Sequence, residues 1–257
     1  AGAHVELTEE GRTLFEGALK VIEAHDRTLE RIAALKKSPS ITVGGLYRNV
    51  HTLQFIANIV RKRRQEGNPL SISYRNVHHR PFCALVQSGE LDVAFTVLER
   101  DTVLSDGLMS LHLFDDPLVA IVMEDHPLAQ KERLSLQDID KQSLLSPDGA
   151  YAIAGAALVH NLFAKHGVTP EYQPVYLQSV QDFPTLDIDD NVLILEESIQ
   201  RQQPLTDAFR VLPFVEEEAC FPIHAVYRAK DGRGEIGRFI EELAIESEAY
   251  RQKISNP

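Results

Sequence analysis

The first part of the chain carries one narrow apolar stripe. Between residues 8 and 37 there is no proline, and apolar side chains recur at alternating spacings of three and four residues. This spacing places them along one side of a long helix, as in a coiled-coil seam. We therefore predict a helix that pairs with another helix, although packing on its own domain is the alternative. The seam residues are Phe15, Ala18, Ile22, Leu29 and Ile32, and His25 fills the position between Ile22 and Leu29 as a packing residue rather than a pH sensor.

The ends of this helix carry the usual signals. Thr8 is suited to the N-cap, and Glu9 and Glu10 in the first turn match the positive end of the helix dipole. Ser38 and Pro39 end the helix.

Beyond Pro39, short β-branched runs alternate with helical patterns. We predict strands over residues 40–44, 70–74 and 92–97, with helices over 52–65 and 81–88 between them. Strands that alternate with helices in this way form parallel βαβ units with helices on both faces of the sheet. Gly89 is suited to the C-terminal cap of the second helix.

A second α/β unit follows. Its predicted strands cover residues 117–123, 143–146, 172–177 and 192–195, with a short helix from residue 136 and a longer one over 155–166. The last strand, 222–228, and the last helix, 235–250, have no partner sheet of their own. We expect them to return to the first unit, which gives two crossovers and a cleft between two lobes.

Composition narrows the class of protein. Hydrophobic residues make up 44% and charged residues 25%, as in soluble globular proteins, and no apolar run approaches the ~20 residues that span a bilayer. The net charge of −12 opposes a DNA-binding surface. The N-terminus has no pattern of a secretion signal, so we expect a cytoplasmic protein. Cys83 and Cys220 then suit buried reduced thiols, and a redox pair would require them to meet in space.

Several short segments resemble LysR-type transcriptional regulators in their order and spacing. These segments are residues 5–12 before the heptad helix, 41–44, 88–95, 117–119, 126–129 and 134–138. The resemblance covers nearly the whole chain. It implies an α/β fold of two Rossmann-like subdomains with periplasmic-binding-protein-like architecture and two crossovers, preceded by a long linker helix.

The resemblance also implies a domain organisation. Residues 1–39 would be a wing remnant and dimerising linker helix, 40–112 and 221–257 effector-binding subdomain I, and 113–220 subdomain II with the crossovers. The family's N-terminal winged helix-turn-helix has no counterpart in this sequence. The implied partners are a small-molecule effector and further copies of the chain, as a homodimer or homotetramer. DNA would be bound only through the missing domain, and no membrane is expected.

One segment departs from the family pattern. Residues 187–192 read Asp-Ile-Asp-Asp-Asn-Val, where the family usually has a glycine-rich turn before a strand.

Candidate effector-binding residues follow from the fold. Ligands of open α/β sheets lie outside the carboxyl ends of the strands, near helix N-termini whose free amides favour anions. Arg48, in the loop after the first strand, is the best anion partner by chemistry, with a solvated loop arginine as the alternative. Asn76 as a turn residue and Ser179 as a helix cap are similar alternatives. The candidate set is Tyr47, Arg48, Asn49, Asn76, Thr96, Ser146, Gly149, Tyr151, Gln178 and Ser179.

Other chemistries find little support. His51, His78 and His79 have no carboxylate at helical spacing beside them, so we expect no metal. We also expect no cofactor and no enzyme activity, because no phosphate loop, dinucleotide fingerprint or nucleophile elbow occurs. The alternative function is a solute-binding receptor of a transport system, which shares the two-lobed cleft. The heptad helix argues against it, since a secreted receptor has no use for a dimerising seam.

Overall fold

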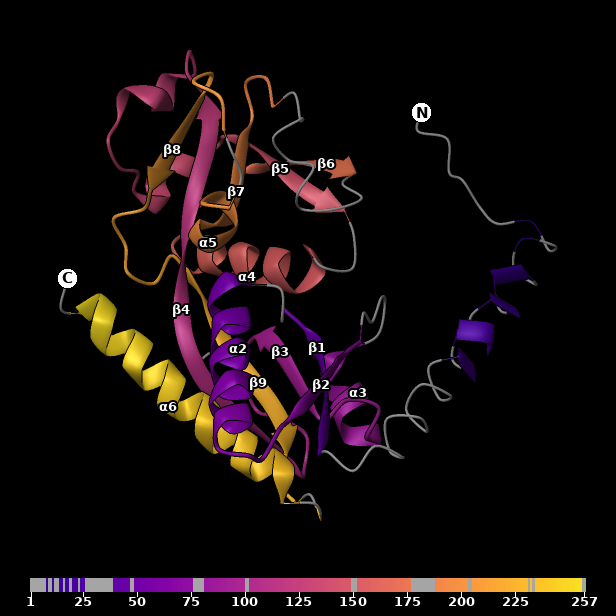
Figure 1. The fold of residues 1–257 in the computed structure, drawn as a ribbon. Coiled ribbons are helices and arrows are strands. Elements are labelled where there is room, and N and C mark those ends of the chain that lie inside the picture. Colours follow the sequence, from indigo (N-terminus) through magenta and orange to yellow (C-terminus); the bar gives the residue numbers. More distant parts are fainter. Residues whose placement is uncertain are drawn as a thin grey trace.

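The computed structural model gives an α/β fold built on one mixed, nine-stranded sheet (Figure 1). The strand order is β2-β1-β3-β9-β4-β7-β5-β6, with β8 paired to β4. The structure describes residues 39–46, 49–75, 81–99, 102–148, 152–176, 188–202, 205–230, 232 and 234–255, and single positions between Thr8 and His25.

The first half of the sheet confirms the predicted βαβ units. β1 (Ser40–Gly45) pairs in parallel with β2 (Ser71–Tyr74) and β3 (Val93–Val97). α2 (Val50–Gln65) and α3 (Phe82–Ser88) connect them, and Gly89 ends α3 in the left-handed conformation, as predicted. Phe95 packs in one core with Phe55 of α2, whereas the adjacent Ala94 packs in another with Leu85 of α3. Since neighbouring strand residues face opposite sides, α2 and α3 cover opposite faces.

The second half contains β5 (Ser143–Asp148), β6 (Glu171–Tyr176) and β7 (Val192–Glu196), in which β5 pairs in parallel with both others. α4 (Ala152–Lys165) links β5 to β6, and the predicted short helix is the 3-10 turn η2 (Leu136–Ile139). Three elements were not predicted from the sequence. They are η1 (Pro127–Gln130), α5 (Glu197–Gln200) and β8 (Phe209–Pro213).

Two long strands join the halves. β4 (Leu108–Met123) begins nine residues before the predicted strand at 117–123, so that prediction was too short. Its first part pairs with β9 (Cys220–Arg228) and its second part with β7 and β8. α6 (Glu235–Ser255) follows β9 and packs against α2 and β4. The last strand and the last helix thus return to the first half of the sheet, as predicted. Figure 1 shows β4 running through both halves of the molecule.

The segment without its expected glycine still forms a tight turn. Asp189 has φ +47°, in the left-handed region that aspartate tolerates better than most residues. The amide N–H of Asn191 donates to the Ile188 carbonyl at 2.8 Å, and the Ser143 hydroxyl donates to Asn191 Oδ1 at 2.6 Å. A polar turn therefore replaces the glycine-rich one before β7.

The N-terminal seam is only partly described. The described positions from Gly11 to His25 are helical, and the Gly11 N–H donates to Thr8 Oγ1 at 3.1 Å, which confirms the predicted cap. Phe15 and Ile22 are 52% and 56% exposed, so the described residues leave about half of each apolar side chain uncovered. Leu29 and Ile32 lie outside the described residues.

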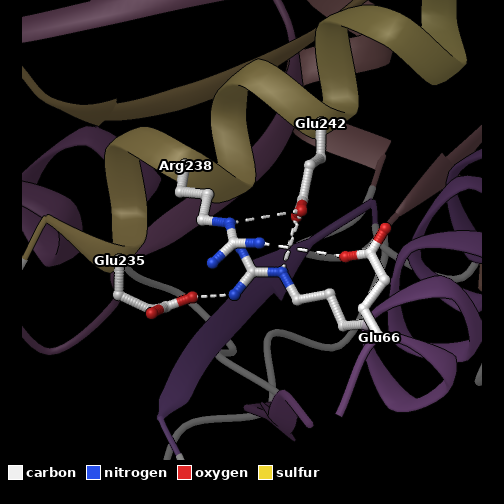
Figure 2. A network of polar contacts seen from close by, with 5 residues as sticks. Glu66, Glu235, Arg238 and Glu242 are labelled. Carbon is white, nitrogen blue, oxygen red and sulfur yellow. Dashed lines mark hydrogen bonds and ion pairs between the residues drawn. The ribbon is translucent and has the colours of Figure 1, made fainter. Parts of the chain in front are cut away.

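A buried arginine ties α2 to α6 (Figure 2). Arg63 on α2 is fully buried, and its guanidinium donates to Glu242 at 2.8 and 3.0 Å and to Glu235. Arg238, which is half exposed, lies 3.7 Å from the same Glu242 carboxylate and 3.9 Å from Glu66. A buried charge is tolerable only with such partners, so this network fixes α6 on α2.

We expect Arg63→Ala to lower the free energy of unfolding by about 3–5 kcal/mol, because it leaves two partly buried carboxylates without their cation. Arg238→Ala is the matched control in the same network. It should cost no more than about 1 kcal/mol, since exposed ion pairs contribute little. Urea unfolding measures both variants, and equal losses would contradict a special role for the buried arginine.

Candidate effector site

The predicted site residues divide into described and undescribed positions. Asn49, Thr96 and Ser146 are described. The others, Tyr47, Arg48, Asn76, Gly149, Tyr151, Gln178 and Ser179, lie outside the described residues. The described strands β1, β3 and β5 end next to several of these positions, so the frame of the site can be built from them.

The turn after β1 is held tightly against β3. The Leu46 N–H donates to the Phe95 carbonyl at 2.7 Å, and Gly45 has φ +80°. A Cβ atom at Gly45 would lie 2.0 Å from the same Phe95 oxygen, so only glycine fits. This close approach fixes where the chain leaves β1 towards α2.

Asn49 connects three elements through its side chain. Its Oδ1 accepts the N–H groups of His51 and Thr52, which caps α2. Its Nδ2 donates to Asp116 Oδ2 at 2.8 Å and to Ser198 Oγ at 2.9 Å. The predicted effector contact is therefore already engaged in a link between α2, β4 and α5.

Asp116 is the centre of this link, and it was not among the residues predicted for the site. The side chain is 2% exposed and accepts the Ser198 hydroxyl at 2.5 Å and the Ser198 N–H at 3.2 Å. We call Asn49, Asp116 and Ser198 the polar node, because their hydrogen bonds join the first half of the sheet to the second through β4. The contacts span 67, 82 and 149 residues of sequence, so no local pattern could reveal them.

Two carboxyl groups share this region. Burial raises the pKa of Asp116, against the hydrogen bonds from Ser198 and Asn49, which lower it. Burial, with a smaller effect of the Asp116 charge, raises the pKa of Glu196 to about 7, against a backbone hydrogen bond. Glu196 ends β7, immediately before α5. The Glu196 carboxyl group, at the end of β7, is therefore partly protonated near neutral pH, because its pKa is raised to about 7.

An aromatic cluster covers the α2 side of the node. His51 Nε2 lies 3.1 Å from the Tyr250 hydroxyl, and the His51 ring meets Phe114 edge-on at 5.4 Å. Burial lowers the pKa of His51. The His51 side chain on α2 therefore packs against β4 and α6. Within the described part of the chain, no group of three metal-ligating side chains occurs.

A second polar cluster lies on the opposite face of the crossover strands. Thr96, 6% exposed, is the register partner of His224 on β9, and His224 is the register partner of His112 on β4. The two imidazole rings lie 5.1 Å apart, and His112 Nε2 is 2.9 Å from Asp115 Oδ1. Thr96 was predicted as a site residue. His112 was missed because the first part of β4 was not recognised as a strand, and His224 because its pairing with Thr96 and His112 joins distant segments.

The two cysteines do not indicate redox chemistry. Neither forms a disulfide among the described residues, and both are partly buried, Cys83 on α3 and Cys220 at the start of β9. Burial raises the pKa of the Cys83 thiol, which disfavours the reactive thiolate.

Comparison with known proteins decides the family. Residues 51–246 match the model of the LysR substrate binding domain. The chain belongs to this family. Among its curated relatives, the Hca operon transcriptional activator HcaR of Escherichia coli (strain K12) is 27% identical over 168 residues, which cover 65% of this chain and 55% of HcaR. The hydrogen peroxide-inducible genes activator of Dickeya chrysanthemi is 21% identical over 173 residues.

Solved structures agree with the fold. The LysR family regulator CbnR has a TM-score of 0.69 at 16% identity, covering 94% of this LysR chain and 82% of CbnR. The BenM effector binding domain, solved with its effector benzoate, has a TM-score of 0.64 at 19% identity, covering 85% and 95%. These likenesses confirm the predicted fold class. The chain spans about half the length of the curated relatives it matches. No helix among the described residues is long and apolar enough to cross a membrane.

The raised pKa of Glu196 makes a prediction for this LysR domain. Between pH 4.5 and about 7 the folded state binds more protons at Glu196 than the unfolded state, so stability falls as pH rises through this window. At pH 8 we expect the free energy of unfolding of Glu196→Gln to exceed that of wild type by about 1–3 kcal/mol. At pH 4.5 the two should differ little. Urea unfolding at both pH values tests this, and a difference that does not change with pH would contradict it.

Proposed function

We propose that this chain is the effector-sensing and dimerisation region of a LysR-type transcriptional regulator, which binds a small organic anion between the two halves of its sheet. The observation that carries the proposal is the pair of crossover strands, β4 and β9, which join two α/β halves at the carboxyl ends of β1 and β3. Ligands of such sheets bind at these ends. Subdomain I would comprise residues 40–112 and 221–257, and subdomain II residues 113–220.

The chemistry around this edge favours an anion. α2 begins there, and its dipole favours negative charge beside the N–H groups of His51 and Thr52 that Asn49 caps. Arg48 directly precedes this cap and would supply the counter-charge. The net charge of −12 opposes anions only at long range, because salt screens it within about 10 Å.

The effector would control DNA binding by a winged helix-turn-helix carried elsewhere in the whole protein. Of the alternatives, a transport receptor has no support among the relatives, whose names describe regulators. Enzyme activity has none either, since the family consists of regulators. A regulator of this kind would act in the cytoplasm.

A thermal-shift panel of small organic acids, each beside its amide, tests the anion proposal. A bound ligand stabilises the folded state by mass action, so at least one carboxylate should raise the melting temperature while its amide does not. Stabilisation by cations or by uncharged compounds alone would overturn the proposal.

Arg48 has a more specific prediction. A charge-assisted hydrogen bond contributes about 1.5–3 kcal/mol, so Arg48→Ala should weaken binding of the stabilising carboxylate about ten- to a hundredfold without loss of the fold. Calorimetry measures this, with Arg61→Ala, an exposed arginine of α2, as the control. Unchanged affinity in Arg48→Ala would remove Arg48 from the site.

The linker seam predicts association through its apolar stripe. The double variant Phe15→Glu, Ile22→Glu places charges on the seam and should dissociate the dimer, because an apolar seam drives helix pairing. Lys20→Glu, off the seam on the same helix, should leave the dimer intact. Light scattering at micromolar concentration separates the outcomes, and a wild-type monomer would contradict the prediction.

A further inference from the structure

His224 is a partly buried side chain whose two ring nitrogens are both shielded from solvent. Neither nitrogen has a hydrogen-bond partner among the described residues. A neutral imidazole has one donor and one acceptor, and leaving them unpaired in a buried place costs free energy. Unpaired buried polar groups of this kind are rare in folded proteins and call for an explanation.

The position of His224 connects it to the candidate effector site. It is the register partner of Thr96, so the two side chains lie next to each other on the same face of adjacent strands. Thr96 is near the carboxyl end of β3, the edge at which ligands of such sheets bind. The Thr96 hydroxyl has only a weak contact with the Val97 carbonyl, at 3.5 Å, so it is available for a better acceptor.

The groups that face His224 come from the two neighbouring strands. β4 presents His112 and Asp115, which lie 2.9 Å apart, and β3 has no titratable side chain. On β9 itself, the nearest residues on the same face are Pro222 and Val226. Burial first, and the His112 charge second, lower the pKa of His224 to about 4, while Asp115 acts in the opposite direction. The free protein therefore holds His224 neutral at physiological pH.

We propose that His224 is an effector-binding residue, which donates a hydrogen bond to the anionic group of the ligand together with Thr96, and that it takes up one proton as the ligand binds. The proposal rests on the proposed function, because it places the ligand at the Thr96 edge. An anion beside a buried imidazole favours the charged form, and the proton comes from solvent. The Asp115 carboxylate, 2.9 Å from His112, favours a positive charge on His224 and so supports its protonation.

The test uses the whole chain and trifluoroacetate, a small carboxylate that stays ionised in acid. NMR of the ¹⁵N-labelled histidines follows the titration of His224, assigned by its absence in His224→Gln. In sodium chloride the midpoint should lie near pH 4. In trifluoroacetate at equal ionic strength it should rise by at least about one pH unit, which corresponds to roughly tenfold preference of the anion for the protonated ring. An unchanged midpoint would overturn the proposal.

Affinity for the same probe gives a second readout. Calorimetry should show trifluoroacetate binding that weakens as the pH rises from about 4 to the raised midpoint, by up to about tenfold per pH unit, as proton uptake requires. This pH dependence should vanish in His224→Gln and persist in His160→Gln, which removes an exposed histidine of α4. A pH dependence retained in His224→Gln would exclude His224 as its source.

These outcomes separate the two proposals. If a carboxylate effector is found but the His224 midpoint does not respond to anions, the effector site stands and the role of His224 is wrong. If trifluoroacetate shifts His224 but no organic acid of the panel stabilises the chain, the anion-sensing function fails while the site itself exists.

Discussion

The pairing of β4 with β9 is the interaction on which the rest of the structure depends. The ladder runs from Leu108 opposite Arg228 to Pro117 opposite Cys220, and β4 then continues into the second half of the sheet as the partner of β7 and β8. Backbone hydrogen bonds on these shared strands therefore place Asp116, His112 and His224 at the boundary between the halves. The register shift between His112 and Phe114 is the one irregularity in this ladder. Bulges bend a strand and re-aim its side chains, and this one lies between the two polar clusters.

The two faces of the crossover strands carry different chemistry. On the α2 face, Asp116 is fully engaged by Asn49 and Ser198, so its buried charge is compensated. On the other face, the His224 ring has no partner. A satisfied polar node makes the connection between the halves rigid and specific, whereas an unsatisfied group makes a place where a ligand gains hydrogen bonds. The same pair of strands thus carries the satisfied polar node on one face and the unpaired His224 ring on the other.

Local patterns predicted most of the fold and little of the site. β1, α2, α3 and β3 were recognisable because burial on one or both faces imposes the apolar runs of strands or the spacing of helices. The first part of β4 was missed, since polar positions alternate through it and Asp115, Asp116 and Pro117 resemble a turn. β8 was missed because only one of its five residues is buried, so no apolar run marks it. The role of Asp116 and the isolation of His224 depend on contacts between distant segments, which a single sequence does not encode in any short motif.

A crystal structure of the chain bound to its best stabilising carboxylate tests the central claim most directly. The account predicts electron density for the ligand between the two halves of the sheet, with its anionic group against Thr96, His224 and the turn that precedes α2. Ligand density only on an outer surface, such as the exposed side of α6 around Ile245 and Glu248, and none in contact with Thr96 would contradict it.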